Sequence, residues 1–202
     1  MYSGLIIKMT TEKIELKKLK LGKIKVTIIG DSPYLPEPMD FEMLEMYDKK
    51  RSNQIYTKDI KSEEDKLLDK KYLTDDKKEG IPSRAFYNSM IRGSSYLFER
   101  KDGGMRNIKE GVIVMGEILP LKWKKKRILK HWGKTSGRSG SPKLILRNAY
   151  DNWSCELTIQ YNTANISAEQ IINVLNWSGF HIGVGAFRKE NTGNYGLFHV
   201  KL

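Results

Sequence analysis

Polar and apolar residues alternate strictly in two separate stretches of the chain. In residues 23–29 every second position is Ile or Val, and in residues 153–162 every second position is apolar, starting at Trp153. A period of two places all the apolar side chains on one face of a strand. Both stretches therefore predict half-buried strands. The almost wholly apolar residues 111–119 predict a central strand.

Two other stretches have apolar residues at the three- and four-residue spacing of a helix face. The first begins at Ser83, a favourable N-cap residue, and its apolar face comprises Phe86, Met90, Ile91 and Leu97. The second begins with Ser167 and Gln170, which have the spacing of a capping box. We expect this second helix to end at Gly179, because glycine commonly follows the last turn.

The order of the expected elements is typical of an α+β domain. After the second helix, residues 181–187 and 195–202 predict two more strands joined by a glycine-bearing turn. The alternation of strands and helices favours an antiparallel sheet with helices on one face, in a single domain spanning residues 1–202. Residues 40–80 are highly charged with few apolar positions, so we expect them to form an insertion that stands off this domain.

The positive charge of the chain is concentrated in one stretch. The formal net charge is +12 and the pI is near 9.6, which favours a polyanionic partner such as a nucleic acid. Residues 112–147 hold ten basic residues and one acidic residue. We expect residues 120–143 to form a basic loop whose cations contact phosphates and whose indoles stack on bases. The candidate contacts are Lys122, Trp123, Lys124, Lys125, Lys126, Arg127, Lys130, His131, Trp132, Lys134 and Arg138. The alternative is a solvated basic loop without a ligand.

A glycine-rich segment near the C-terminus is a second candidate for nucleic-acid binding. Because glycine lacks a Cβ, the backbone there can approach another chain closely and present N–H groups to phosphate oxygens. The candidate residues are Gly183, Gly185, Arg188, Lys189, Gly193 and Gly196. The alternative interpretation is a long β-hairpin with glycine bulges and no ligand.

The composition gives no support to several classes of protein. The single cysteine, Cys155, excludes an intramolecular disulfide, and three dispersed histidines form no metal-binding motif. We therefore expect no metal and no cofactor. No apolar stretch approaches the length of a membrane span, and the N-terminal residues lack the apolar core of a signal peptide. These features predict a cytoplasmic protein without membrane contact.

Two motifs match a known pattern. One is the helix start Ile81-Pro82-Ser83 followed by Arg92, and the other is the glycine turn of residues 193–196. Together they resemble the RAMP superfamily, the ferredoxin-like RNA-binding proteins of CRISPR effector complexes. The C-terminal half also resembles an uncharacterised group of phage and prophage proteins. The RAMP resemblance implies a ferredoxin-like or RRM-like fold and RNA-backbone contacts from Ser83, Arg84, Asn88 and Arg92.

The same resemblance implies how the chain would act. The insertion at 40–80 and the basic loop at 120–143 would take the places of the finger and thumb that clamp RNA in CRISPR backbone subunits. Such subunits polymerise head to tail along a strand, a contact that builds an open helix. The expected location is the cytoplasm of a prokaryotic host cell.

Three functions fit these observations. The favoured one is a non-catalytic single-stranded nucleic-acid-binding protein, phage-encoded and polymerising on its ligand, with RNA preferred and single-stranded DNA as the other ligand. The second is a metal-independent endoribonuclease in which His131 is the general base. The third is an architectural or inhibitor protein whose basic loop binds an acidic protein partner.

Overall fold

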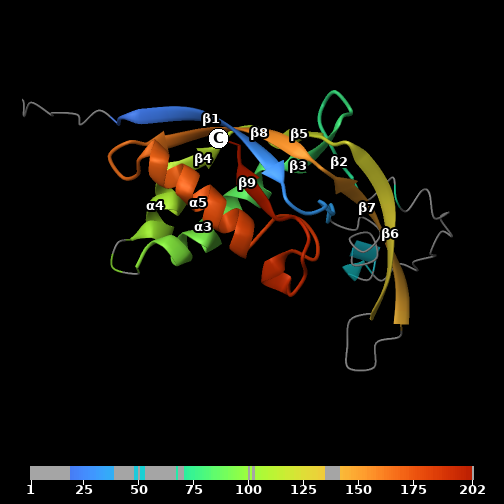
Figure 1. Cartoon of the computed structure of the whole chain (residues 1–202). Helices are drawn as coiled ribbons and strands as arrows, with labels where there is room; N and C mark the ends of the chain where they lie inside the picture. The colour runs from blue at the N-terminus through green and yellow to red at the C-terminus, as the bar shows by residue number, and fades with distance from the viewer. Residues whose placement is uncertain are drawn as a thin grey trace, which may run out of the picture.

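The computed structural model describes residues 19–38, 48–49, 51–52, 67, 71–99, 101, 103–134 and 142–201. The core of the fold is an antiparallel sheet built on β1 (Leu21–Gly30) and β8 (Ser154–Asn162), which pair along the whole of β8 (Figure 1). Both strands fall where the alternating pattern predicts them. The short strand β9 (Phe198–Val200) pairs with the far side of β1, while β4 (Val112–Val114) and β5 (Ile118–Lys122) pair with β8.

Three helices lie on one face of this sheet: α3 (Ser83–Leu97), α4 (Gly104–Gly111) and α5 (Ala168–His181) (Figure 1). The elements β1, α3, β4 with β5, β8, α5 and β9 follow the β-α-β-β-α-β order of a ferredoxin-like fold. In space the strands run β9, β1, β8 and then β4 and β5. The predicted α+β class, with an antiparallel sheet and helices on one face, is therefore confirmed.

The core lies between the sheet and the helices and is rich in aromatic residues. Trp153 is fully buried, and its ring lies near the buried rings of Tyr34, Phe86 and Phe198. Its indole N–H donates a 2.8 Å hydrogen bond to the Ser32 carbonyl, so the polar atom of this large side chain is satisfied. Cys155 is buried in the same core, and burial raises the pKa of its thiol to about 12.

The two predicted helix starts have different outcomes. The capping box at the start of α5 is confirmed, because Ser167 accepts from the Gln170 N–H and the Gln170 side chain accepts from the Ser167 N–H. The predicted N-cap role of Ser83 is wrong. Pro82 occupies the N-cap position without a side-chain hydrogen bond, and Ser83 is the first helical residue, buried, with its N–H bonded to the Glu117 carbonyl.

The segment after α5 also differs from the prediction. Residues 181–187 form no strand, because α5 continues to His181 and a loop follows, with one 3₁₀ turn, η2 (Lys189–Asn191). Gly179 lies inside the helix and does not end it. A Cβ at this position would collide with the Phe198 carbonyl, so the glycine permits α5 to lie directly against β9.

The insertion between β1 and α3 joins the sheet at its end. Strands β2 (Tyr72–Leu73) and β3 (Glu79–Pro82) pair with each other, and β3 pairs with β5. Strands β2 and β3, which fall within or end just after the expected insertion at 40–80, therefore extend the sheet. Residues 39–47, 50, 53–66 and 68–70 of this insertion lie outside the described residues.

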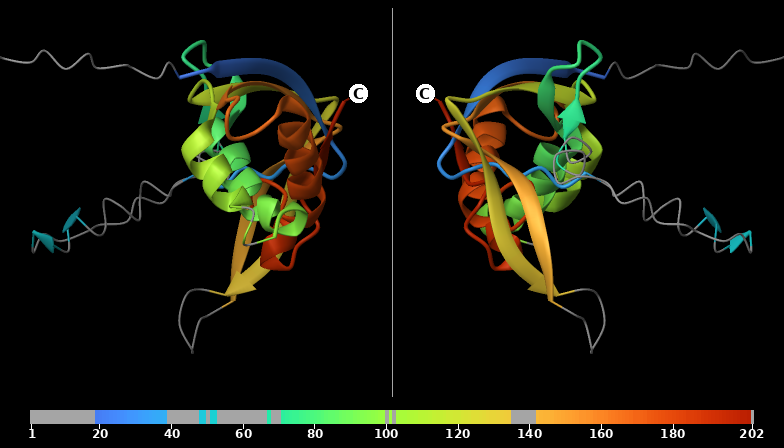
Figure 2. Two further views of the ribbon diagram at one scale, coloured as in Figure 1. Left: turned by 90° about the vertical axis from the view of Figure 1, so that its left-hand side faces the viewer. Right: turned by 90° about the vertical axis from the view of Figure 1, so that its right-hand side faces the viewer.

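The expected basic loop at 120–143 contains regular structure. After β5, strand β6 (Lys125–Lys134) pairs along its length with β7 (Pro142–Asp151) as a separate two-stranded sheet. Figure 2 shows this hairpin reaching beyond the body of the domain. Its base packs on the C-terminal loop through Leu35, Ala149 and Ala186, with Leu129 and Phe187 beside them. Residues 135–141 lie outside the described residues.

A partly buried ion-pair cluster also holds the hairpin against the sheet. The Glu79 carboxylate of β3 accepts from Lys126 of β6 at 2.7 Å and from Lys71 at 3.0 Å. Burial alone would raise the pKa of Glu79, but these hydrogen bonds outweigh it and the pKa lies below its ordinary value. No helix within the described part of the chain is long and apolar enough to cross a membrane.

Candidate nucleic-acid interface

A groove runs between the first turns of α3 and the loop that follows α5. It consists of two adjoining hollows of about 120 and 150 Å³ that share Ala85, Gly185 and Arg188 as lining residues. We call the two hollows together the α3–loop groove. The first hollow is further lined by Asn88, Ser89, Arg92, Ile182, Gly183, Val184 and Glu190, and the second by Tyr34, Glu37, Tyr72 and Pro82.

The α3 side of the groove presents unsatisfied polar groups. Because Pro82 supplies no side-chain cap and only the Ser83 N–H of the first turn is bonded, to Glu117, the amides of Arg84 and Ala85 have no acceptor within the described chain. One turn further on, Ser89 is only 2% exposed, and its hydroxyl has no hydrogen-bond partner among the described residues. A buried hydroxyl without a partner costs about 1–3 kcal/mol, so its position at a hollow points to a ligand group.

The loop side of the groove depends on glycine. Gly183 and Gly185 have φ values of +77° and +82°, which residues with a Cβ rarely adopt. The Gly183 N–H bonds to the Ser178 carbonyl, and the Val184 N–H bonds to the Gly196 carbonyl. Within the described residues the Gly185 N–H has no acceptor, and this residue lines both hollows. The loop therefore adds another available donor to the groove.

Gly193 and Gly196, also predicted as ligand contacts, have a structural role inside the loop. A Cβ on Gly193 would collide with the Phe187 carbonyl, and one on Gly196 would collide with the Val184 carbonyl. Neither residue lines the α3–loop groove. Because these residues have no side chain, two parts of the loop can pack directly against each other.

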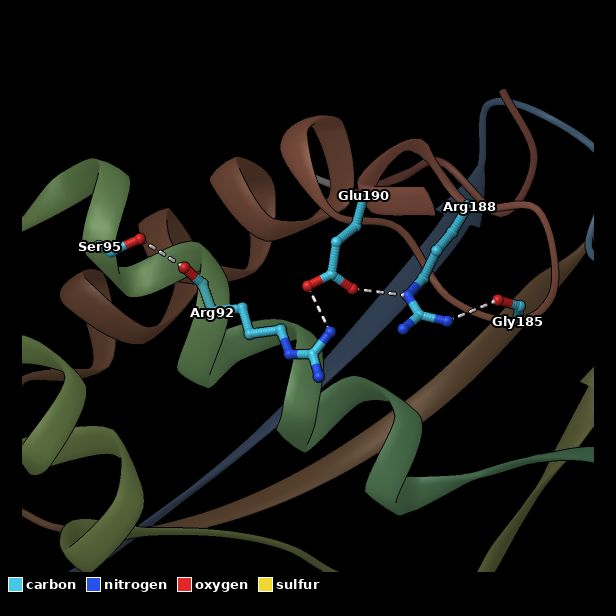
Figure 3. Close-up of polar contacts among 5 residues, drawn as sticks. All are labelled: Arg92, Ser95, Gly185, Arg188 and Glu190. Carbon is cyan, nitrogen blue, oxygen red and sulfur yellow. Dashed lines mark hydrogen bonds and ion pairs between the residues drawn. The ribbon is translucent and has the colours of Figure 1, made fainter. Parts of the chain in front are cut away.

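A three-residue ion-pair network spans the first hollow. Glu190 lies between Arg92 of α3 and Arg188 of the loop, and its two carboxylate oxygens accept one from each guanidinium (Figure 3). Arg188 also donates to the Gly185 carbonyl at 3.1 Å. Burial alone would raise the pKa of Glu190, but the hydrogen bonds from the two arginines outweigh it and lower the pKa below its ordinary value.

The four α3 residues that the resemblance suggests as RNA contacts lie in different surroundings. Asn88 and Arg92 line the groove. Arg84 is exposed in the first turn of α3, and Ser83 is buried with its N–H bonded to the Glu117 carbonyl. Lys189 lies outside the groove, with its ammonium 3.6 Å from the centre of the Phe180 ring. The structure therefore brings together predicted residues from two distant parts of the sequence.

The basic residues of the expected loop at 120–143 are partly paired with acidic neighbours. Lys122 pairs with Glu156, Lys126 with Glu79, and Arg127 with Asp151. By contrast, Lys124 and Lys125 are exposed and have no acidic partner within the described residues. Lys130 is exposed on β6, Lys134 ends that strand, and Arg138 lies outside the described residues.

The aromatic candidates of the expected loop at 120–143 differ in how exposed their side chains are. Trp132 is 73% exposed, and Trp123 is 39% exposed with its ring edge-on to Tyr150. His131 packs edge-on against Phe187, with ring centres 4.4 Å apart, and both of its ring nitrogens are shielded from solvent. A general base must reach the proton that it removes, so this position favours a packing role for His131.

Ser89 and Glu190 are among the groove residues that sequence reasoning missed. Ser89 has no sequence signal, because only the three-dimensional position of its hydroxyl reveals that it is unsatisfied. Glu190 directly follows the basic pair Arg188-Lys189, and that adjacency is a signal that could have found it. An acid beside two bases in a tight turn is a natural internal partner for them.

No family model and no curated protein sequence matches this chain. Among solved structures, a chain in the cryo-EM structure of the Type III-B Cmr-beta bound to cognate target RNA is similar, with a TM-score of 0.53 and 12% identity. The match covers 91% of this chain and 60% of that chain, so this chain spans less than two thirds of its length. At this identity the likeness shows a shared fold, in agreement with the ferredoxin-like order of the elements. The crystal structure of Cmr6 from Pyrococcus furiosus matches less well, with a TM-score of 0.44 and 9% identity. That match covers 91% of this chain and 100% of that one.

Proposed function

We propose that this chain is a non-catalytic protein that binds single-stranded RNA, and that the α3–loop groove holds the sugar–phosphate backbone. The observation that carries the proposal is the unpartnered hydroxyl of Ser89, buried beside the groove within the described part of the chain. Ala85, whose amide lies in the uncapped first turn of α3, and Arg188 line the same groove. A phosphate accepts from amides at a helix N-terminus and from an arginine fork, so one ligand group would satisfy these donors together.

The choice of RNA rests on the solved structure of the same fold that contains a target RNA. A role related to CRISPR effector complexes fits that likeness. Single-stranded DNA offers the same phosphates, so it is the comparison ligand in the test below. A phage origin stays a prediction.

We also propose that copies of the chain assemble along the strand. The β6–β7 hairpin extends beyond the domain body (Figure 2). The exposed Lys124 and Lys125 lie where the chain enters β6. A projecting basic element is suited to contacting nucleic acid that runs on to a neighbouring copy, and a head-to-tail contact of this kind does not close. Light scattering with and without an RNA long enough for several copies measures this assembly.

The decisive test of the groove is the variant Ser89→Ala. Removing an unsatisfied buried hydroxyl is expected to raise the free energy of unfolding by about 1 kcal/mol, because a desolvation penalty disappears. The same change is expected to weaken RNA binding about 2- to 10-fold, because the ligand then has one hydrogen-bond donor fewer. The measurements are thermal denaturation and fluorescence anisotropy with a labelled single-stranded RNA, the DNA of the same sequence and an RNA duplex.

The matched control is Ser94→Ala in the same helix. The Ser94 hydroxyl is buried and already donates to the Ile91 carbonyl at 2.7 Å, so its removal should lower stability slightly and leave RNA affinity unchanged. The proposal fails if the wild-type protein binds no single strand. It also fails for this groove if Ser89→Ala keeps full affinity. An absence of nucleic-acid binding together with capture of an acidic protein would favour the architectural function.

A further inference from the structure

Exposed aromatic side chains gather beyond the Arg92 end of the α3–loop groove. Tyr96 of α3 stacks on His181 of α5 with ring centres 4.3 Å apart and planes 9° apart, and Trp177 stacks on the same imidazole at 5.2 Å and 15°. Phe180 lies edge-on to His181 at 5.0 Å. We call these four residues the aromatic stack. Tyr96, Trp177 and Phe180 are 52%, 42% and 59% exposed, so large apolar surfaces remain open to solvent.

The aromatic stack is continuous with the groove. Arg92 lines the groove, and Tyr96 follows it by four residues on α3, which places their Cβ atoms about 5–6 Å apart on one helix face. On the other side, His181 directly precedes Ile182, another lining residue of the groove. A chain leaving the groove along α3 therefore meets the stack next.

Cations lie on several sides of the aromatic stack. Lys189 stands over the Phe180 ring, and Arg92 is one turn away from Tyr96. Tyr96 also lines a hollow of about 900 Å³ between the end of α3 and α4, whose other lining residues include Arg106 and Lys109. Flat aromatic surfaces interleaved with cations are the combination that binds single strands, since bases stack while phosphates are neutralised.

We propose that the aromatic stack is a platform for an unpaired nucleobase, next to the phosphate that the α3–loop groove holds. This inference rests on the proposed RNA-binding function and extends it from the backbone to the bases. Because every base has a flat π-face, such a platform accepts any sequence. It selects single strands, because the bases of a duplex are paired and stacked on their neighbours and have no free face for the platform.

The test compares two labelled oligonucleotides of equal charge: an oligouridine and the same ribose–phosphate chain without bases. The wild-type protein is expected to bind the abasic chain about 5- to 150-fold more weakly, the range for one stacked base. The double variant Tyr96→Leu/Trp177→Leu keeps apolar side chains but removes the flat rings, so it should bind both oligonucleotides with the same, weakened affinity. The single change Trp177→Phe keeps a ring at this position and should retain part of the preference for bases.

The comparison variant is Trp132→Leu, which removes the exposed ring of β6 that the sequence also nominates for base stacking. If the aromatic stack is the platform, this variant should keep more of the preference for oligouridine over the abasic chain than Tyr96→Leu/Trp177→Leu does. The dependence of affinity on salt should be the same in the wild type and in Tyr96→Leu/Trp177→Leu, because the phosphate contacts are unchanged.

The outcomes separate this inference from the function on which it rests. If the wild type binds neither oligonucleotide, the RNA-binding function itself is wrong. If the wild type binds both with the same affinity, the platform is refuted but RNA binding by the groove is not. The same conclusion follows if only Trp132→Leu abolishes the preference for bases. If Tyr96→Leu/Trp177→Leu lowers the particle mass in light scattering without RNA, a second copy of the chain covers the rings, which also overturns the proposal.

Discussion

The carboxylate of Glu190 occupies the place between two arginines where an RNA phosphate would be attracted. It accepts from both Arg92 and Arg188, so in the free protein it neutralises one of the two positive charges of the groove (Figure 3). A bound phosphate has to compete with this internal anion. The variant Glu190→Gln keeps the shape and a carbonyl acceptor but removes the negative charge. We expect it to bind single-stranded RNA more tightly than the wild type at low salt.

The size of the effect follows from the charge count. The three side chains sum to +1 in the wild type and to +2 in Glu190→Gln. One additional neutralised phosphate steepens the slope of log affinity against log salt by about 0.7 for a single strand. Between 50 and 200 mM salt, the advantage of the variant should therefore shrink by about 2.6-fold.

The same variant should be slightly less stable than the wild type. Removing two partly exposed ion pairs costs about 0.4–2 kcal/mol. Because the folded pKa of Glu190 lies below its ordinary value of 4.5, its contribution is present above about pH 4.5 and is lost as pH falls through the folded pKa. This acid-side loss of stability should be absent in Glu190→Gln. Thermal denaturation at pH 7 and at a series of decreasing pH values below 4.5 measures both effects.

The assay is anisotropy of a labelled single-stranded RNA at five or more salt concentrations. The control is Glu156→Gln, which changes the net charge equally and releases Lys122 from an ion pair on the sheet face away from the helices. A steeper slope for Glu190→Gln than for Glu156→Gln is the expected result. Equal slopes, or a uniform loss of affinity at all salt concentrations in a folded Glu190→Gln, would refute the competition between carboxylate and phosphate.

Two further variants test the loop and the hairpin. Gly196→Ala should lower the free energy of unfolding by at least about 2 kcal/mol, because φ is +67° and the new Cβ would meet the Val184 carbonyl. Gly103→Ala, with φ of +66° but open space, should cost clearly less in the same thermal melt; equal costs would mean that close approach is unimportant. Lys124→Gln/Lys125→Gln should reduce the salt slope of RNA binding by about 0.7 for each phosphate that is no longer neutralised, whereas Lys122→Gln, already ion-paired, should change it less. An unchanged slope in the double variant would remove the hairpin base from the interface.

The elements that periodicity predicts well are those whose environment is simple. β1 and β8 have one face on the core and one in solvent, so their alternation is visible in the sequence. The lysines and glycines of the β6–β7 hairpin predict a loop and hide the pairing, which is held by buried contacts such as Ala149 on Leu35. The prediction of a strand at 181–187 is wrong for the opposite reason, since tertiary packing of α5 on β9 overrides the local pattern.

The sequence predicts the basic residues of the candidate site, but it does not predict how they are arranged in space. Motif resemblance nominates Arg92, glycine content nominates the loop around Arg188, and the structure places both at one hollow. The aromatic stack is invisible in the sequence, because Tyr96 and His181 lie far apart along the chain and become neighbours only where α3 and α5 cross. That crossing requires Gly93, where a Cβ would collide with Ser178.

The shared hydrophobic base of the hairpin and the glycine-rich loop has a thermodynamic consequence. Ala149 of β7 and Ala186 of the loop belong to one small cluster, and Arg147 of β7 lies over the Phe187 ring at 5.2 Å. Displacing the hairpin therefore displaces the loop that carries Arg188. By linkage, a ligand on the hairpin that changes the affinity of the groove has its own affinity changed by the same factor when the groove is filled. If the hairpins of two molecules were in contact, filling the groove of one molecule would therefore change the affinity of the groove of the other.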